Sequence, residues 1–242
     1  MHGSACAKQE KLPCIEGFFC RKIPDKKELT RQIETLETAN GINKDAHVRE
    51  LKSTSASIGT IDVHKEAREL KMWRTHGRQV YDVNIHVQPS FQEFSDCMLS
   101  ARHRNVRILH FAWHGQSPYC FFWLKYGTAT GCECIQPDRF AGIIKTELAG
   151  LGIVGVECVV LNACETEEMG KKLRTAGVRH VVCWSTEVND GTARQFALDY
   201  YGCLNQQDLS HAKDYTLAFH QAIVHMRICE DGTRAAQNYL AA

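Results

Sequence analysis

The chain has almost no net charge and no extended apolar segment, and both absences narrow what it can do. Its 29 Lys and Arg residues nearly balance 28 Asp and Glu residues, for a formal charge of +1. Nucleic acids and anionic lipids are bound through concentrated positive charge, so we expect no nucleic-acid partner. No segment is apolar enough to span a membrane, and residues 1–20 do not contain the apolar core of a signal peptide. We therefore expect a soluble, cytoplasmic protein with no membrane partner.

Proline is scarce, internal repeats are absent, and cysteine is abundant, with 12 residues. Thiols stay reduced in the cytoplasm, so cysteines within apolar runs, such as Cys158 and Cys183, are interpreted as small buried hydrophobic residues. The pair Cys132 and Cys134 is too closely spaced for a zinc knuckle, and no second pair follows at the expected distance. We therefore expect hairpin cysteines there and no metal site.

With 242 residues and 44% hydrophobic content, the chain can bury a substantial core. We expect a partly helical N-terminal extension over residues 1–44 and one α/β domain over residues 45–242. Alternating strand and helix patterns call for right-handed crossovers and a parallel sheet. The predicted strands are 79–87, 106–113, 157–162 and 180–185, the helices are 29–36, 63–73, 89–99, 137–148, 169–175, 192–204 and 208–229, and the hairpin arms are 121–124 and 131–135.

Two of the predicted strands are followed by residues whose side chains are common in catalytic sites. The strand over 106–113 is followed by His114 and Gly115, and about 50 residues later the strand over 157–162 is followed by Ala163 and Cys164. The carboxyl ends of parallel strands share a crevice, where the imidazole could take the thiol proton and leave a nucleophilic thiolate. This is the layout of a cysteine peptidase.

The pattern resembles the CHAT branch of the caspase-like peptidases. One strand ends in His-Gly, and a later strand ends in a turn with Ala-Cys, a polar residue and Thr. The likeness continues through Ala-Gly-Val-Arg at 176–179, Trp184 and Val-Asn-Asp at 188–190. It covers roughly residues 80–225, with weaker support from about residue 45, and its spacing is the one described for caspases. The resemblance implies a caspase-like three-layer α/β/α sandwich with a mostly parallel central sheet. It also implies a strand before the helix over 63–73, although residues 47–52 make a poor one.

The same likeness implies a cysteine endopeptidase acting on a protein or peptide substrate. His114 would be the general base and acid, Cys164 the nucleophile, and the backbone N–H groups of Gly115 and Cys164 the oxyanion donors. The structural alternatives are a buried histidine and an inert thiol, but the two motifs together favour catalysis. A helix starting soon after Cys164 would favour the thiolate. His110 lies on the same strand face as His114, in the sheet core or supporting the dyad.

A substrate pocket is expected around Trp184, Thr186, Glu187 and Asp190. An inward carboxylate there would attract Arg or Lys, whereas the alternative for Asp190 is that it caps the following helix. Asn162 replaces an aspartate that helps metacaspase relatives bind basic residues, so a basic preference cannot be inherited from that position. The chemistry requires no metal and no organic cofactor.

Two other readings stay open. The chain could be a catalytically inactive caspase-like module for signalling or binding, because a dyad in the sequence does not prove assembled geometry. It could also be a peptidase that stays inactive until a regulatory protein partner or homo-oligomerisation orders the groove.

Overall fold

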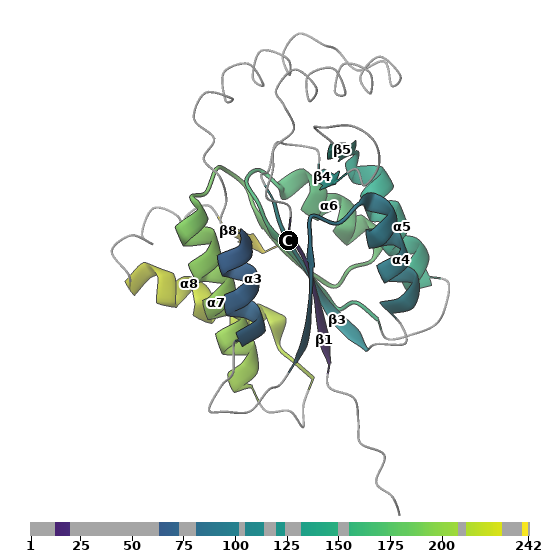
Figure 1. Ribbon diagram of the computed structural model, residues 1–242. Helices are drawn as coiled ribbons and strands as arrows, with labels where there is room; N and C mark the ends of the chain where they lie inside the picture. The colour runs from purple at the N-terminus through teal and green to yellow at the C-terminus, as the bar shows by residue number, and fades with distance from the viewer. Residues whose placement is uncertain are drawn as a thin grey trace, which may run out of the picture.

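A central β-sheet between two layers of helices forms the body of the protein (Figure 1). The computed structural model describes residues 13–19, 63–72, 81–101, 105–113, 120–123, 132–149, 155–207, 212–228 and 239–241. Within these ranges the architecture is the predicted three-layer α/β/α sandwich.

Among the described residues, the main sheet has the strand order β2-β1-β3-β6-β7-β8. All neighbouring strands from β2 to β7 run parallel, and only β8 is antiparallel. The mostly parallel sheet expected from the alternating pattern is therefore confirmed. The strands are β1 (Cys14–Phe19), β2 (Asp82–Val87), β3 (Val106–Ala112), β6 (Cys158–Asn162), β7 (His180–Trp184) and β8 (Tyr239–Ala241).

Of the helices that the structure describes, three pack on each face of the sheet, and Figure 1 shows the two helix layers. Side chains alternate between the faces: Leu109 and Phe111 of β3 join one core cluster, and Ile108 and Ala112 join the other. The first face carries α4 (Phe91–Ala101), α5 (Pro137–Ala149) and α6 (Glu167–Ala176), and the second carries α3 (Val63–Met72), α7 (Asp190–Gln206) and α8 (Tyr215–Ile228). Both faces of the central strands are buried, which explains their nearly continuous apolar sequences.

The strand β1 is the main difference from the sequence prediction. Cys14–Phe19 lies inside the predicted N-terminal extension, yet it pairs with both β2 and β3 in the middle of the sheet. The boundary at residue 44 therefore does not separate the sheet from an extension. All six residues are buried, so the strand has no alternating pattern, and Glu16 and Gly17 interrupt its apolar sequence. The predicted helix over 29–36 and the poor strand over 47–52 lie outside the described residues.

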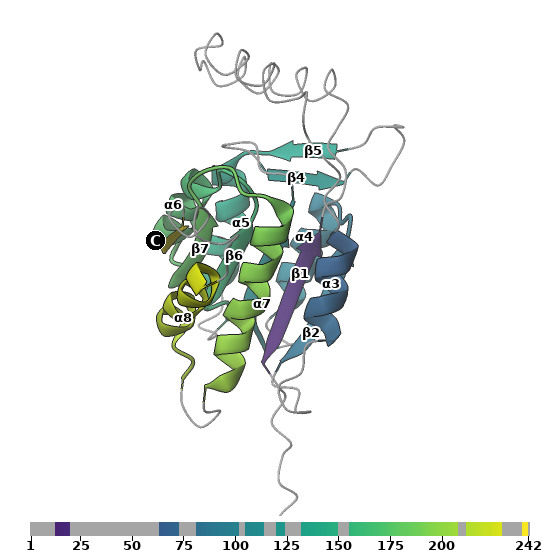
Figure 2. The same ribbon diagram turned by 90° about the vertical axis from the view of Figure 1, so that its left-hand side faces the viewer.

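The predicted hairpin is present as β4 (Cys120–Trp123) and β5 (Cys132–Ile135), which pair antiparallel. It forms a separate small sheet beyond one end of the central sheet, at the top of Figure 2. Cys132 and Cys134 both lie on β5, as expected for hairpin cysteines. The last predicted helix is shorter in the structure, with α8 beginning at Tyr215, and β8 was not predicted.

Candidate active site

The two strands that were predicted to carry the dyad are direct neighbours. β3 and β6 pair in parallel, and Ala112 is opposite Asn162 at their carboxyl ends. Cys164 follows Asn162 by two positions, and in the sequence His114 follows Ala112 by the same number. His114 and Gly115 lie outside the described residues, whereas the turn that holds Cys164 is described in full.

The turn after β6 is fastened to β7 by backbone and hydroxyl hydrogen bonds. Glu165 has a left-handed backbone, with φ of 52°, and its N–H donates to the carbonyl of Thr186 at 3.2 Å. The N–H of Thr166 donates to the carbonyl of Trp184 at 2.9 Å. The Thr166 hydroxyl accepts from the Trp184 N–H at 3.1 Å and donates to the Ala163 carbonyl at 3.0 Å. These contacts fix the backbone of the turn on both sides of Cys164.

The thiol of Cys164 is half-buried and faces the backbone of Val188. Its Sγ accepts from the Val188 N–H at 3.3 Å and lies 3.4 Å from the Val188 carbonyl oxygen, to which the thiol can donate. Burial raises the pKa of the Cys164 thiol, and the carboxylates of Glu187, Asp190 and Glu165 raise it further, whereas the Val188 N–H lowers it. The helix after the turn was expected to favour the thiolate, whereas burial and the neighbouring carboxylates favour the neutral thiol.

A buried polar network lies on the strands that lead to this turn. The Asn162 amide donates to Glu66 Oε1 at 2.7 Å and to the Ala193 carbonyl at 3.1 Å, and its oxygen accepts from the Trp184 indole at 3.1 Å. Glu66, on α3, also contacts His110 Nε2 at 3.1 Å. The network therefore ties β6, the strand that leads to Cys164, to α3 and α7.

His110 has no exposed surface, and its second ring nitrogen lies 2.9 Å from the Tyr201 hydroxyl. The prediction that this histidine lies in the sheet core is confirmed. The sequence analysis missed Glu66 and Tyr201. Glu66 could have been noticed because it stands four residues before Leu70, on the apolar face of α3, where an acidic side chain needs a buried partner.

A comparison with protein families matches the CHAT domain model to residues 25–231, which is most of the chain. The chain belongs to the CHAT domain family. A search of curated proteins gave no match. The CHAT domain is related to the caspase-like cysteine peptidases, and the sheet order and helix layers of this chain are consistent with that relationship. In the part of the CHAT domain that the structure describes, no helix has both the length and the apolar character to cross a membrane.

The predicted pocket residues of the CHAT domain divide into two groups. Thr186, Glu187 and Asp190 are exposed beside the Cys164 turn, so they can meet a ligand. Trp184 is 1% exposed and packs in the core, so its side chain stabilises the site from within and does not line a surface.

The capping alternative for Asp190 is wrong. The N-cap of α7 is Asn189, whose side chain accepts from the Thr192 N–H at 2.8 Å. Asp190 is the first residue of the helix, where the partial positive charge of the N-terminus suits a carboxylate. Although Asp190 is exposed, partial desolvation of its carboxyl raises the pKa, and the carboxylate of Glu66 adds to the increase.

Proposed function

We propose that this CHAT domain is a cysteine endopeptidase that uses His114 and Cys164 as a catalytic dyad. One observation carries the proposal: β3 and β6 are parallel neighbours whose carboxyl ends are level, with Ala112 opposite Asn162. His114 and Cys164 each come two residues after these positions in the sequence. We therefore expect both at the carboxyl edge of the sheet, where ligands of parallel α/β folds bind. The hydrogen bonds of the turn from Ala163 to Thr166 also support the proposal, because a nucleophile at Cys164 would be held in a defined position.

In the proposed reaction, the imidazole of His114 takes the proton of the Cys164 thiol, and the sulfur attacks the scissile carbonyl of a bound peptide. The backbone N–H groups of Gly115 and Cys164 stabilise the oxyanion. His114 then protonates the leaving amine and activates a water molecule, which hydrolyses the thioester. An extended substrate would lie along the segment after β7 and gain backbone hydrogen bonds there.

The acidic surface beside the thiol points to a substrate with a basic residue before the scissile bond. The side chains of Glu187 and Asp190 are exposed, and both carboxylates are close enough to affect the Cys164 thiol. A positional peptide library should show a preference for Arg or Lys that weakens in Glu187→Gln. The control Glu168→Gln, an exposed carboxylate in the first turn of α6, should leave the preference unchanged. A library profile with no basic preference contradicts this assignment.

The direct test is peptide hydrolysis together with labelling by a thiol-directed acyl probe. Cys164→Ala and His114→Ala should each lower turnover by about 10⁴-fold or more, because removing either member of a nucleophile and base pair costs this much in related systems. The matched controls are Cys203→Ala, a buried thiol on α7, and His225→Ala, an exposed imidazole on α8. Turnover by Cys164→Ala equal to that of the unaltered protein would exclude the dyad.

A second function is favoured by the state of the thiol. The Cys164 thiol contacts the backbone of Val188, and its raised pKa disfavours the thiolate in the conformation described. The chain would then be a binding module, or a peptidase that a regulatory partner or a second copy activates by moving the 185–191 segment away from the sulfur. Acyl-probe labelling that increases with protein concentration supports activation by a second copy. No labelling under any condition, with no hydrolysis, supports the binding module.

A further inference from the structure

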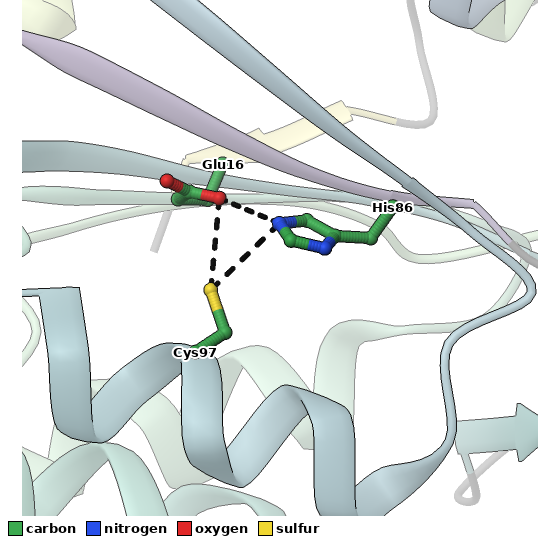
Figure 3. Close-up of side chains that lie close together, drawn as sticks. All are labelled: Glu16, His86 and Cys97. Carbon is green, nitrogen blue, oxygen red and sulfur yellow. Dashed lines mark hydrogen bonds and ion pairs between the residues drawn. The ribbon is translucent and has the colours of Figure 1, made fainter.

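A second group of side chains with metal-binding atoms lies between the β1-β2 edge of the sheet and α4. Glu16 of β1, His86 of β2 and Cys97 of α4 point toward one another across the gap between strands and helix (Figure 3). In the sheet, β3 separates β1 from β6, so this group belongs to elements other than those carrying the Cys164 turn.

The three ligand-type atoms are close together. His86 Nε2 lies 2.7 Å from Glu16 Oε2, Cys97 Sγ lies 3.6 Å from the same oxygen, and Cys97 Sγ lies 3.8 Å from His86 Nε2. In a tetrahedral zinc site the bonds to sulfur are about 2.3 Å and those to nitrogen and oxygen about 2.0–2.1 Å, so ligand atoms lie about 3.3–3.6 Å apart. The distance from sulfur to the Glu16 oxygen already matches, the distance from sulfur to the His86 nitrogen must shorten by about 0.2 Å, and the carboxylate-imidazole pair must open by about 0.6 Å.

The burial of the group favours a bound cation. Glu16 is fully buried, and Cys97 is buried against it, whereas His86 is about one third exposed at the edge strand. A buried carboxylate is costly unless positive charge compensates it, and either the paired His86 or a bound cation can supply that charge. The partial exposure of His86 leaves a route for an ion from solvent.

The surroundings fix the ligands in orientation. The Asn84 amide donates to Glu16 Oε1 at 2.9 Å and so leaves Oε2 to face His86 and Cys97. The His86 ring stacks on Phe18 at 4.8 Å between centroids. Supporting contacts of this kind are typical around metal ligands. The Cys14 thiol lies 3.4 Å from Glu16 Oε1, next to the group.

We propose that Glu16, His86 and Cys97 bind a zinc ion that joins the β1-β2 edge of the sheet to α4. A donor set of one thiolate, one imidazole and one carboxylate suits Zn²⁺ and not the oxygen-preferring Mg²⁺ or Ca²⁺. Cys97 binds as the thiolate, and its proton leaves to solvent. His86 binds through Nε2 with its ring proton on Nδ1. A water molecule completes the tetrahedron.

The test uses the full chain after chelation of metals, titrated with Zn²⁺ and separately with Co²⁺. The unaltered protein should bind one Zn²⁺ at this group and unfold at a higher temperature with zinc present. Cobalt should give the strong thiolate-to-metal absorption of a tetrahedral site. Loss of an outer partner weakens metal sites by about 10–100-fold, so His86→Gln and Cys97→Ala, which remove ligands, should each weaken Zn²⁺ binding by at least about 100-fold.

The control Cys203→Ala removes a buried thiol on the opposite helix layer and should leave the affinity unchanged. His86→Gln alters a partly exposed side chain, so it decides the matter if Cys97→Ala does not fold. Loss of both zinc binding and the cobalt absorption in His86→Gln supports the site. Zinc affinity that is the same in His86→Gln and the unaltered protein, or no Zn²⁺ binding at all, overturns it.

Discussion

Changing Asn162 to aspartate tests the buried network that ties β6 to α3 and α7. The change keeps the size and shape of the side chain but replaces an NH₂ group with a carboxylate oxygen. That oxygen would face Glu66 Oε1, which the amide nitrogen contacts at 2.7 Å, and the Ala193 carbonyl at 3.1 Å. Two donated hydrogen bonds are lost, and two carboxylates meet in a buried place.

The electrostatic part of the cost has an upper limit because the new carboxyl can take up a proton on folding, and the lost hydrogen bond to Ala193 adds about 1 kcal/mol at any pH. An aspartate in the unfolded chain has a pKa near 3.9, so holding it protonated at pH 7 costs about 1.4 kcal/mol for each of about three pH units, or roughly 4 kcal/mol. Protonated, the carboxyl can donate one hydrogen bond back to Glu66. The folded-state pKa is raised, so the loss of stability grows as the pH rises above about 3.9, by about 1.4 kcal/mol per unit. At pH 5 the electrostatic part of the loss should therefore be only about 1.5 kcal/mol.

The assay is urea unfolding of Asn162→Asp at pH 5, 6 and 7, each compared with the unaltered protein. The control is Asn189→Asp, the same chemical change at an exposed N-cap, where aspartate caps equally well and the cost should be below about 0.5 kcal/mol. Adding Glu66→Gln to Asn162→Asp exchanges donor and acceptor and should recover about 2 kcal/mol at pH 7. A cost below about 1 kcal/mol at pH 7, or no recovery in the double variant, would refute the network.

Three further predictions concern the turn and the helix after it. Gly170→Ala places a Cβ 2.8 Å from the Cys183 sulfur, so overpacking should outweigh the better helix propensity and cost about 1 kcal/mol in urea unfolding, a loss that Cys183→Ala should remove. Thr166→Val removes the hydroxyl contacts with Leu161, Ala163 and Trp184 and should cost about 1–3 kcal/mol, whereas Thr175→Val, which loses one exposed contact, should be nearly neutral in thermal unfolding. The raised pKa of Cys164 should make its alkylation slow at pH 7, with a rate that still increases above about pH 9, as followed by mass spectrometry of the peptide that contains Cys164. An alkylation rate that reaches a plateau by pH 7 contradicts this.

Local pattern was enough to predict much of the fold. The alternation of strands and helices indicated a parallel sheet between helix layers, and the ends of the strands carrying Ala112 and Asn162 were predicted within one residue or two. These strands are buried on both faces, so their apolar runs stand out from the turns between them. The exposed Thr186 and Glu187 were also predictable, because they follow a buried strand that ends at Trp184.

The pattern did not reveal β1, because Cys14–Phe19 contains a glutamate and a glycine and is a strand only through its two neighbours. The same burial brings Glu16 to His86 and Cys97, which are about 70 and 81 residues away in the chain. Burial of the turn after β6 also raises the pKa of Cys164. Periodicity and strand ends are local properties that the order of residues determines by itself. Partners, burial and proton affinity depend on which distant segments meet when the core closes, and only the tertiary structure decides them.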